Sequence, residues 1–291
     1  MIAGGNHTIT KSIPQSACSA DSSLYTREPW ALPRQLDKLE FGDKRMDKRK
    51  LIKYITITFA ITGICWWGLA LLTNYNIVDS SQGIFTLFHV IGGFGPTIAA
   101  IMVLPNKSPR SLLSFVFSCK KSSVWYLLLF CLMQGLIIGL SSMETNPAIP
   151  WFATPIVMFS ATFLGGGNEE LGWRGIMQPE LEKKFSFPIA TLITGCVWML
   201  WHVPLWFVIG ASQQNMNFAL YAIYGLILSF WLATIHKKTK SIFSCCVFHG
   251  FSNLMLSFFV IKINWILILG LIASLVFTTW LYYKGEKESV R

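Results

Sequence analysis

The sequence predicts an all-α, polytopic membrane protein with about eight transmembrane helices. Of its 291 residues, 53% are hydrophobic and only 13% are charged, which is about half the charged share of an ordinary soluble domain. The charges are clustered and leave seven uncharged tracts, each reaching the length of about 20 residues that crosses the hydrocarbon core. The tract 185–235 holds two spans, which the polar stretch 210–217 separates. This pattern disfavours a soluble globule, a disordered chain and a nucleic-acid-binding protein.

The eight expected helices follow these tracts, and each ends where charges or polar residues resume. Their expected bounds are 52–73, 83–104, 123–141, 152–172, 188–209, 218–235, 241–261 and 264–283. The composition of the polar N-terminal arm, 1–50, is not that of a classical secretory signal, and its serine content leaves an organelle-transit segment open as an alternative. We expect disorder over 1–35. The expected domains are therefore the arm, a membrane domain over 51–283 and a short tail over 284–291.

The basic residues predict the orientation of the chain. Of the 24 Lys and Arg residues, 23 fall on the side of the expected helices that holds both termini, and only Lys262 falls on the other side. Positive charges are retained on the cytoplasmic side of a membrane, so we expect both termini in the cytoplasm and a multi-pass protein of the cell membrane. This topology accounts for the net charge of +10 without a nucleic-acid partner.

Two carboxylates and three histidines are the titratable groups expected within the spans. Every acid except Glu169 and Glu170 falls in the arm, a linker or the tail, whereas His89, His202 and His249 fall in expected helices. An ionisable group at membrane depth is costly and usually serves a function. We interpret His89, which stands alone, as a structural residue.

Helical spacing divides these groups into roles. Glu170 and Arg174 are four residues apart, in the order that favours an ion pair on one helix face. Glu169 is turned about 100° away from Glu170, so we assign Glu170 and Arg174 to a structural clamp and Glu169 to the reaction. His249 and Asn253 are also four apart and share a face of the seventh expected helix.

Two local features concern the fourth and fifth expected helices. Pro204 disturbs the fifth helix just after His202, and glycines 165–167 permit close packing or a break in the fourth helix. With the bounds above, Glu169 lies shallower than the histidines. For them to meet, the fourth helix must continue past residue 172 or the fifth must start later.

A carboxylate beside a histidine can hold a water molecule and take its proton, and a second histidine with an amide can stabilise an oxyanion. These are the requirements of peptide-bond hydrolysis without a covalent intermediate. The preferred interpretation needs no cofactor. Because two histidines and a carboxylate also form a catalytic zinc set, Glu169, His202 and His249 remain candidate ligands of a Zn²⁺ ion.

Three motifs follow one another along the chain: Glu169-Glu170-Leu-Gly-Trp-Arg174, Trp198-x-x-x-His202 and His249-x-x-x-Asn253. In this order they resemble the motifs of the CPBP family, the CAAX-protease and bacteriocin-processing intramembrane proteases also called Abi proteins, of which the first is Glu-Glu-x-x-x-Arg and the second is Phe-x-x-x-His. The resemblance covers roughly residues 50–283, and its one departure is Trp198, where the family usually has Phe.

The resemblance implies an eight-helix intramembrane endopeptidase whose site faces the cytoplasm. It implies that Glu169 and His202 activate the water and that His249 and Asn253 stabilise the oxyanion. The implied substrate is a CAAX-like peptide, a bacteriocin or leader-type peptide, or a membrane protein. The oligomeric state and the need for metal stay open.

Two other function classes stay open. A proton-coupled transporter would also bury a Glu/His/Asn relay, although the chain shows no internal repeat. A non-catalytic bacteriocin-immunity or regulatory membrane protein would keep its protective effect with alanine at Glu169, whereas a protease would lose cleavage.

Overall fold

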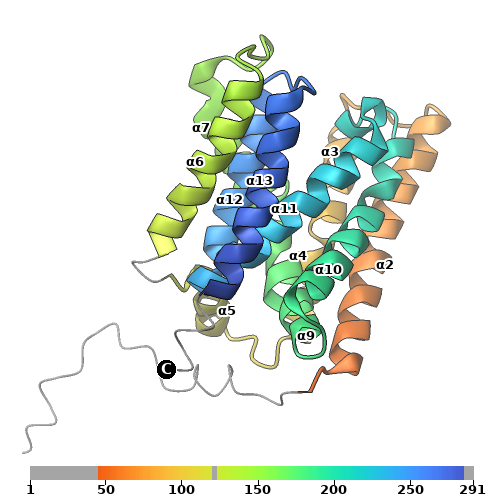
Figure 1. Ribbon diagram of the computed structural model, residues 1–291. Helices are drawn as coiled ribbons and strands as arrows, with labels where there is room; N and C mark the ends of the chain where they lie inside the picture. The colour runs from red at the N-terminus through yellow and green to blue at the C-terminus, as the bar shows by residue number, and fades with distance from the viewer. Residues whose placement is uncertain (1–44, 120–122, 285–291) are drawn as a thin grey trace, which may run out of the picture. The chain divides into compact units, whose positions relative to one another are not determined.

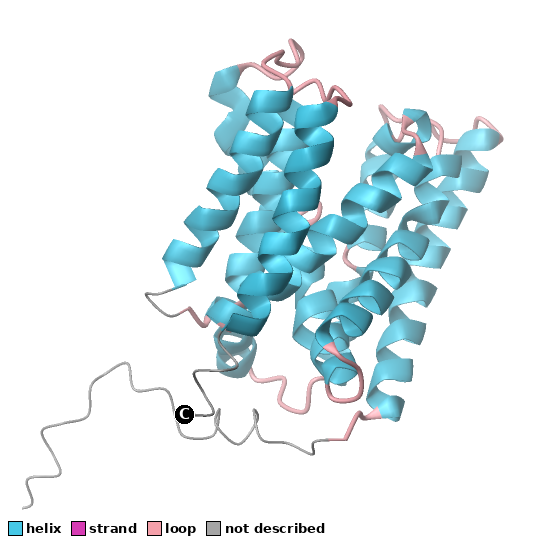
Figure 2. Ribbon diagram, in the orientation of Figure 1, coloured by secondary structure: helices cyan, strands magenta, loops and turns pink. Residues whose placement is uncertain are grey.

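The computed structural model describes residues 45–119 and 123–284, which are helical apart from turns, loops and one isolated antiparallel bridge between Thr145 and Phe259 (Figure 1 and Figure 2). The all-α prediction is therefore confirmed. The predicted disorder of residues 1–35, most of the predicted arm and nearly all of the predicted tail lie outside the described residues.

Six long helices and six short ones make up the described chain. The long helices are α2 (Lys48–Asn74), α6 (Ser123–Ser141), α10 (Phe187–His202), α11 (Phe218–Thr239), α12 (Ile242–Phe258) and α13 (Trp265–Lys284). The short helices are α3 (Gly83–Gly93), α4 (Gly95–Val103), α5 (Pro109–Phe117), α7 (Thr154–Phe163), α8 (Glu170–Gly172) and α9 (Gln178–Glu182). The 3₁₀ turns are η2 (Trp151–Ala153), η3 (Gly167–Glu169), η5 (Val203–Phe207) and η6 (Ser212–Asn215), and η4 (Trp173–Met177) is a π-helix.

Local sequence signals explain where the helices begin. Side-chain oxygens of Asp47, Ser108, Asn217 and Ser241 accept hydrogen bonds from backbone N–H groups in the first turns of α2, α5, α11 and α12. Such caps satisfy donors that a helix start leaves without a partner. Helices α4, α5, α7 and α10 instead carry proline in the first turn, where its missing N–H costs nothing.

The helices pack around the segment 167–182, which comprises η3, α8, η4 and α9. Parts of this segment contact α2, α4, α10, α11 and α12. On one side of the molecule α12 packs against α6 and α7, and on the other α2 packs against α3 and α4 (Figure 1). Both expected acid positions therefore lie where the long helices converge.

Several helices have the length and composition to cross a membrane. Five helices meet that test, and the bent pair of α3 and α4 makes a sixth if it forms one span. Their outward surfaces carry large exposed hydrophobic side chains such as Ile64, Trp125 and Val276, a surface that suits lipid rather than water. The structure thus supports a multi-pass membrane protein, while the count of eight spans and the orientation stay predictions.

The fourth expected helix, 152–172, is wrong as a single continuous helix. Helix α7 ends at Phe163, a short loop follows, and helical structure resumes at Gly167 and continues through Glu182. For the acids to reach the histidines, either the fourth helix had to continue past residue 172 or the fifth had to start later. The structure shows the former, because helical structure continues well past residue 172. The stretch 173–187, which lies between the fourth and fifth expected helices, is largely helical.

The charges of that stretch were expected in a linker, but two of them are buried. Arg174 is 0% exposed and Glu180 is 4% exposed. Glu180 pairs with Lys50, at 3.2 Å between Nζ and Oε1, and with Lys183, at 2.9 Å between Nζ and Oε2. The pairing with Lys50 fastens α9 to the first turn of α2.

The second and fifth expected helices are also interrupted. The second consists of α3 and α4, which meet at Phe94 with a bend of 43°. The fifth becomes a 3₁₀ turn directly after His202, at the disturbance predicted from Pro204. In the expected linker 105–122 the chain forms the short helix α5.

Candidate active site

The loop 164–166 brings the acids under α12. Gly166 has a φ of 130°, a backbone conformation that side chains with a Cβ rarely adopt. A Cβ at this position would overlap Asn253 Nδ2 and would lie 3.0 Å from His249 Nε2. Glycine is therefore required here, because the backbone passes directly against two of the predicted site residues.

Hydrogen bonds fix the loop on both sides. Thr97 of α4 donates its hydroxyl to the Asn168 carbonyl at 2.6 Å, and Asn168 Nδ2 donates to the Gly93 carbonyl at 3.2 Å. On the other side, Asn253 Nδ2 donates to the Gly165 carbonyl at 2.9 Å. The break in the fourth segment is thus held between the bend of α3 and α4 and the α12 helix.

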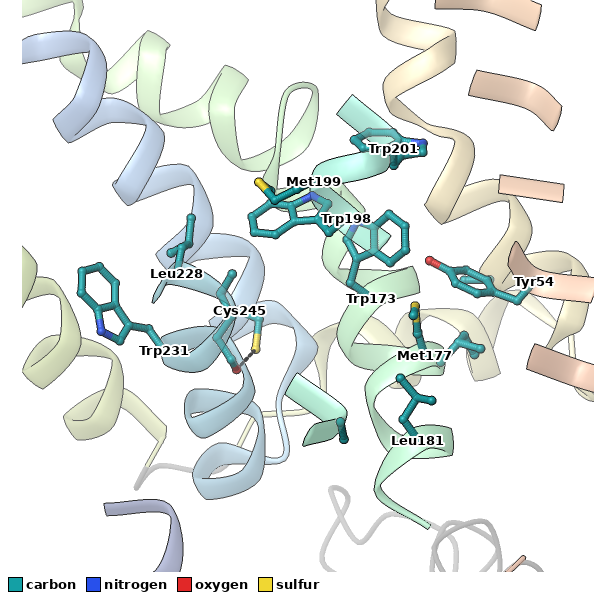
Figure 3. Packing of buried hydrophobic residues seen from close by; sticks show 14 of the residues in the cluster. Tyr54, Trp173, Met177, Leu181, Trp198, Met199, Trp201, Leu228, Trp231 and Cys245 are labelled. Atoms are coloured by element: carbon teal, nitrogen blue, oxygen red, sulfur yellow. Dashed lines mark hydrogen bonds between the residues drawn. The ribbon is translucent and has the colours of Figure 1, made fainter. Parts of the chain in front are cut away.

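Two tryptophans hold the Glu169 carboxylate by one oxygen. Trp198 Nε1 donates to Glu169 Oε2 at 2.6 Å, and Trp173 Nε1 donates to the same oxygen at 3.3 Å. Glu169 is 6% exposed, and no described residue makes a hydrogen bond to its Oε1. The indoles of Trp173 and Trp198 lie together in the packed interior (Figure 3). The carboxylate is therefore oriented, with one oxygen left for another partner.

The neighbouring Glu170 forms a three-residue charge cluster. Its Oε2 lies 3.3 Å from Arg174 Nε, and its Oε1 lies 2.8 Å from His249 Nδ1. Arg174 also donates from Nη2 to the carbonyl of Ser229, at 3.2 Å, and to its hydroxyl, at 2.9 Å. The clamp expected between Glu170 and Arg174 is present and additionally anchors the His249 ring.

His202 closes the last turn of α10 and is fixed through its Nδ1. That nitrogen lies 2.9 Å from the Trp198 carbonyl oxygen. Because a carbonyl only accepts, Nδ1 carries the proton and Nε2 is the basic nitrogen. Within the described residues Nε2 has no hydrogen-bond partner. The ring is packed edge-on against Trp201 and Tyr221, with centroids 4.6 and 5.4 Å apart.

The predicted residues from three segments therefore meet around one side chain, the indole of Trp198. It bonds Glu169, and its ring centroid lies 5.6 Å from that of His202 and 5.2 Å from that of His249. Asn253 joins through the loop, whose Gly166 lies against both it and His249. His89 lies apart from the acids, with its ring stacked on Phe85 and 6.0 Å from Trp66.

The alternative zinc set fits this arrangement poorly. In residues 45–119 and 123–284, no three His, Cys, Asp or Glu side chains lie together so that they could hold a metal ion. His249 Nδ1 is engaged by Glu170, and Glu169 is engaged by two N–H donors. We therefore derive no chemical step from a metal.

Sequence reasoning missed the two indole donors and the Glu170–His249 contact. Trp173 is four residues after Glu169, so its position on the same helix face was available from spacing. Trp198 was noted only as an aromatic replacement for Phe, and nothing in the spacing gives the direction of an N–H group. The rotation of α12 that aims His249 at Glu170 has no local signal.

Comparisons with known proteins agree with this site. Residues 150–255 match the family model for the Type II CAAX prenyl endopeptidase Rce1-like domain, a range that contains all six predicted site residues. CAAX prenyl protease 2 from Methanococcus maripaludis is 25% identical over an alignment of 226 residues, and the match covers 69% of this chain and 82% of that protein. The motifs, the helical membrane architecture and these matches together support an intramembrane protease that is similar to the CPBP family.

Proposed function

We propose that this protease cleaves peptide bonds with a water molecule activated by Glu169 and His202. The observation that carries the proposal is the way both groups are held. Glu169 is fixed through Oε2 and His202 through Nδ1, so that Oε1 and Nε2 remain for the water. A base that is held in a fixed orientation within a buried site needs little reorganisation during the reaction.

In the proposed step, Glu169 takes one proton from the water while His202 Nε2 accepts the hydrogen bond of the other. The water oxygen then forms a bond to the carbonyl carbon of the peptide, whose oxygen becomes an oxyanion. As the C–N bond breaks, the proton held on Glu169 passes to the leaving nitrogen. The products are a carboxylic acid and an amine, so the reaction balances without a cofactor.

His249 and Asn253 are the proposed oxyanion donors. His249 contacts the Glu170 carboxylate through Nδ1, and in the proposal its Nε2, on the opposite side of the ring, donates to the oxyanion. Asn253 uses one N–H on the Gly165 carbonyl and retains a second. N–H donors aimed at a developing oxyanion stabilise the transition state. In this proposal Glu170 and Arg174 act by keeping His249 oriented.

As substrate we propose a prenylated CAAX-type peptide, presented from the cytoplasmic side. The matched family model and the relative from Methanococcus maripaludis both carry the CAAX prenyl designation. A bacteriocin or leader-type peptide is the second substrate to test. Sealed vesicles of known orientation, supplied with peptide from outside, distinguish a cytoplasmic from an external opening of the site.

The test compares wild type with Glu169→Gln in detergent, using a quenched prenylated CAAX peptide. Removal of a general base lowers the rate by about 10²- to 10⁴-fold, and we expect Glu169→Gln to do so. Glu144→Gln, at an exposed acid paired with Lys262, is the matched control and should cleave normally. Full activity of Glu169→Gln would refute the mechanism. Loss of wild-type activity with a chelator, restored by Zn²⁺, would replace it with a metal mechanism.

A further inference from the structure

We propose that Trp198 is a positioning residue for the catalytic water, acting through Glu169 and His202. This inference rests on the proposed function of those two residues. Trp198 Nε1 donates to Glu169 Oε2 at 2.6 Å, and the indole is 2% exposed. Hydrogen bonds to an ionised acceptor are short and about twice as strong as neutral ones. This contact is therefore the main restraint on the orientation of the carboxylate.

The second donor to Glu169 is weaker. Trp173 Nε1 approaches the same Oε2 at 3.3 Å, beyond the usual range of an N–H···O bond. Because both donors use Oε2, they leave Oε1 without a protein donor among the described residues. Loss of the Trp198 donor would let the carboxylate rotate, so that neither oxygen is held for the water.

Trp198 also sets the position of His202. Its backbone carbonyl lies 2.9 Å from His202 Nδ1, which fixes the ring and directs Nε2 as the free nitrogen. One residue thus holds both groups of the proposed base, one through its side chain and one through its main chain. A substitution of the side chain separates the two contributions, because it leaves the carbonyl in place.

Packing prevents the indole from turning its N–H away from Glu169. The guanidinium of Arg174 lies 5.3 Å from the centre of the Trp198 ring. The His249 ring meets the indole edge-on, with an interplanar angle of 84°. These neighbours come from the segment 167–182 and from α12, so the direction of the N–H is set by the tertiary structure as well as by α10.

The test uses Trp198→Phe, which removes the N–H and keeps an aromatic ring. Trp231→Phe is the control for packing, because Trp231 of α11 is 0% exposed in the same hydrophobic core and its Nε1 has no hydrogen-bond partner among the described residues. A hydrogen bond to a charged group lost in the transition state corresponds to about 10- to 100-fold in kcat. We expect this loss for Trp198→Phe, with KM within about twofold of wild type, and an unchanged kcat for Trp231→Phe.

A second variant at Trp198 controls for a packing defect caused by the smaller phenylalanine ring. Replacement of Trp198 by benzothienylalanine exchanges only the N–H for sulfur at nearly constant ring size, and it should reproduce the loss in kcat. Thermal unfolding of all variants in detergent measures the structural effect separately. A purely structural role would lower stability and kcat together in both the Trp198 and Trp231 variants.

The outcomes separate the two proposals. If Glu169→Gln is inactive while Trp198→Phe and the benzothienylalanine variant keep wild-type kcat, the positioning role is refuted and the proposed function stands. If Trp231→Phe loses as much kcat as Trp198→Phe, general packing explains the effect and the positioning role is refuted as well. If Glu169→Gln is active, both proposals fail together.

Discussion

Removing one charge of the Glu170–Arg174 pair should destabilise the protein strongly, whereas removing both should cost far less. Both side chains are 0% exposed, and Arg174 Nε lies 3.3 Å from Glu170 Oε2. Deleting one partner of a buried ion pair leaves an uncompensated charge, which typically costs about 3–5 kcal/mol. We expect Glu170→Gln and Arg174→Met each to lower the free energy of unfolding by an amount in this range.

The contacts that remain in each single variant should keep its loss in the free energy of unfolding at the lower limit of that range, about 3 kcal/mol. In Glu170→Gln the guanidinium keeps its two hydrogen bonds to Ser229 and its position over Trp198. In Arg174→Met the carboxylate keeps its contact with His249. Because the double variant leaves no unpaired charge of the pair, it should cost at least about 2 kcal/mol less than the sum of the two singles, a coupling of the size seen between contacting residues.

The assay is unfolding in mixed micelles by titration with a denaturing detergent, followed by tryptophan fluorescence. The control pair is Glu144 and Lys262, whose side chains are 56% and 58% exposed. Removing either should cost less than about 1 kcal/mol, as for surface ion pairs generally. This account would be refuted if the unfolding free energy lost in the double variant equalled the sum of the two single losses. It would also be refuted if each single loss were no larger than that of the control variants.

Three further expectations concern separate parts of the molecule. Gly166→Ala should abolish cleavage, because its Cβ would displace Asn253 and force a side chain into a φ of 130°; normal turnover would contradict the site geometry. Burial raises the pKa of Glu180, but the donors on Lys183, Asp47 and Lys50 outweigh it and hold the pKa below its ordinary value of 4.5. The ionised Glu180 carboxylate should therefore stabilise the protein above pH 4.5 and lose that contribution below it. If the melting temperatures of Glu180→Gln and wild type fell equally on acidification, this expectation would be contradicted. Gly172→Ala should lower the melting temperature, because its Cβ would overlap the Tyr54 hydroxyl; an unchanged value would show that this contact is loose.

The positions of the helical segments and the local pairs could be predicted from sequence. Uncharged tracts located the five helices that are long and apolar enough to cross a membrane, because crossing lipid excludes charges over a fixed length. The Glu170–Arg174 contact followed from a spacing of four residues on one helix. The break in the fourth segment was one of the two possibilities that its run of glycines left open. In each case the signal lies within one short stretch of chain.

The remainder depends on tertiary structure. Glu180 was expected in a linker between two helices, yet it is buried and pairs with Lys50 of α2. Whether a charge is solvated or paired is decided by helices distant in sequence. The direction of the Trp198 N–H and the rotation of α12 toward Glu170 depend on packing angles that no local spacing encodes.

The loop 164–166 has a thermodynamic consequence. Its backbone groups are hydrogen-bonded within the protein: the Gly165 N–H donates to the Ser160 carbonyl, the Gly166 N–H to Asn168 Oδ1, and the Glu169 N–H to the Gly166 carbonyl. Ordering a residue's backbone costs about 1–2 kcal/mol of conformational entropy, and here that cost falls on folding rather than on substrate binding. Variants that loosen the loop should therefore make association with substrate entropically more costly, even where every reactive side chain is retained.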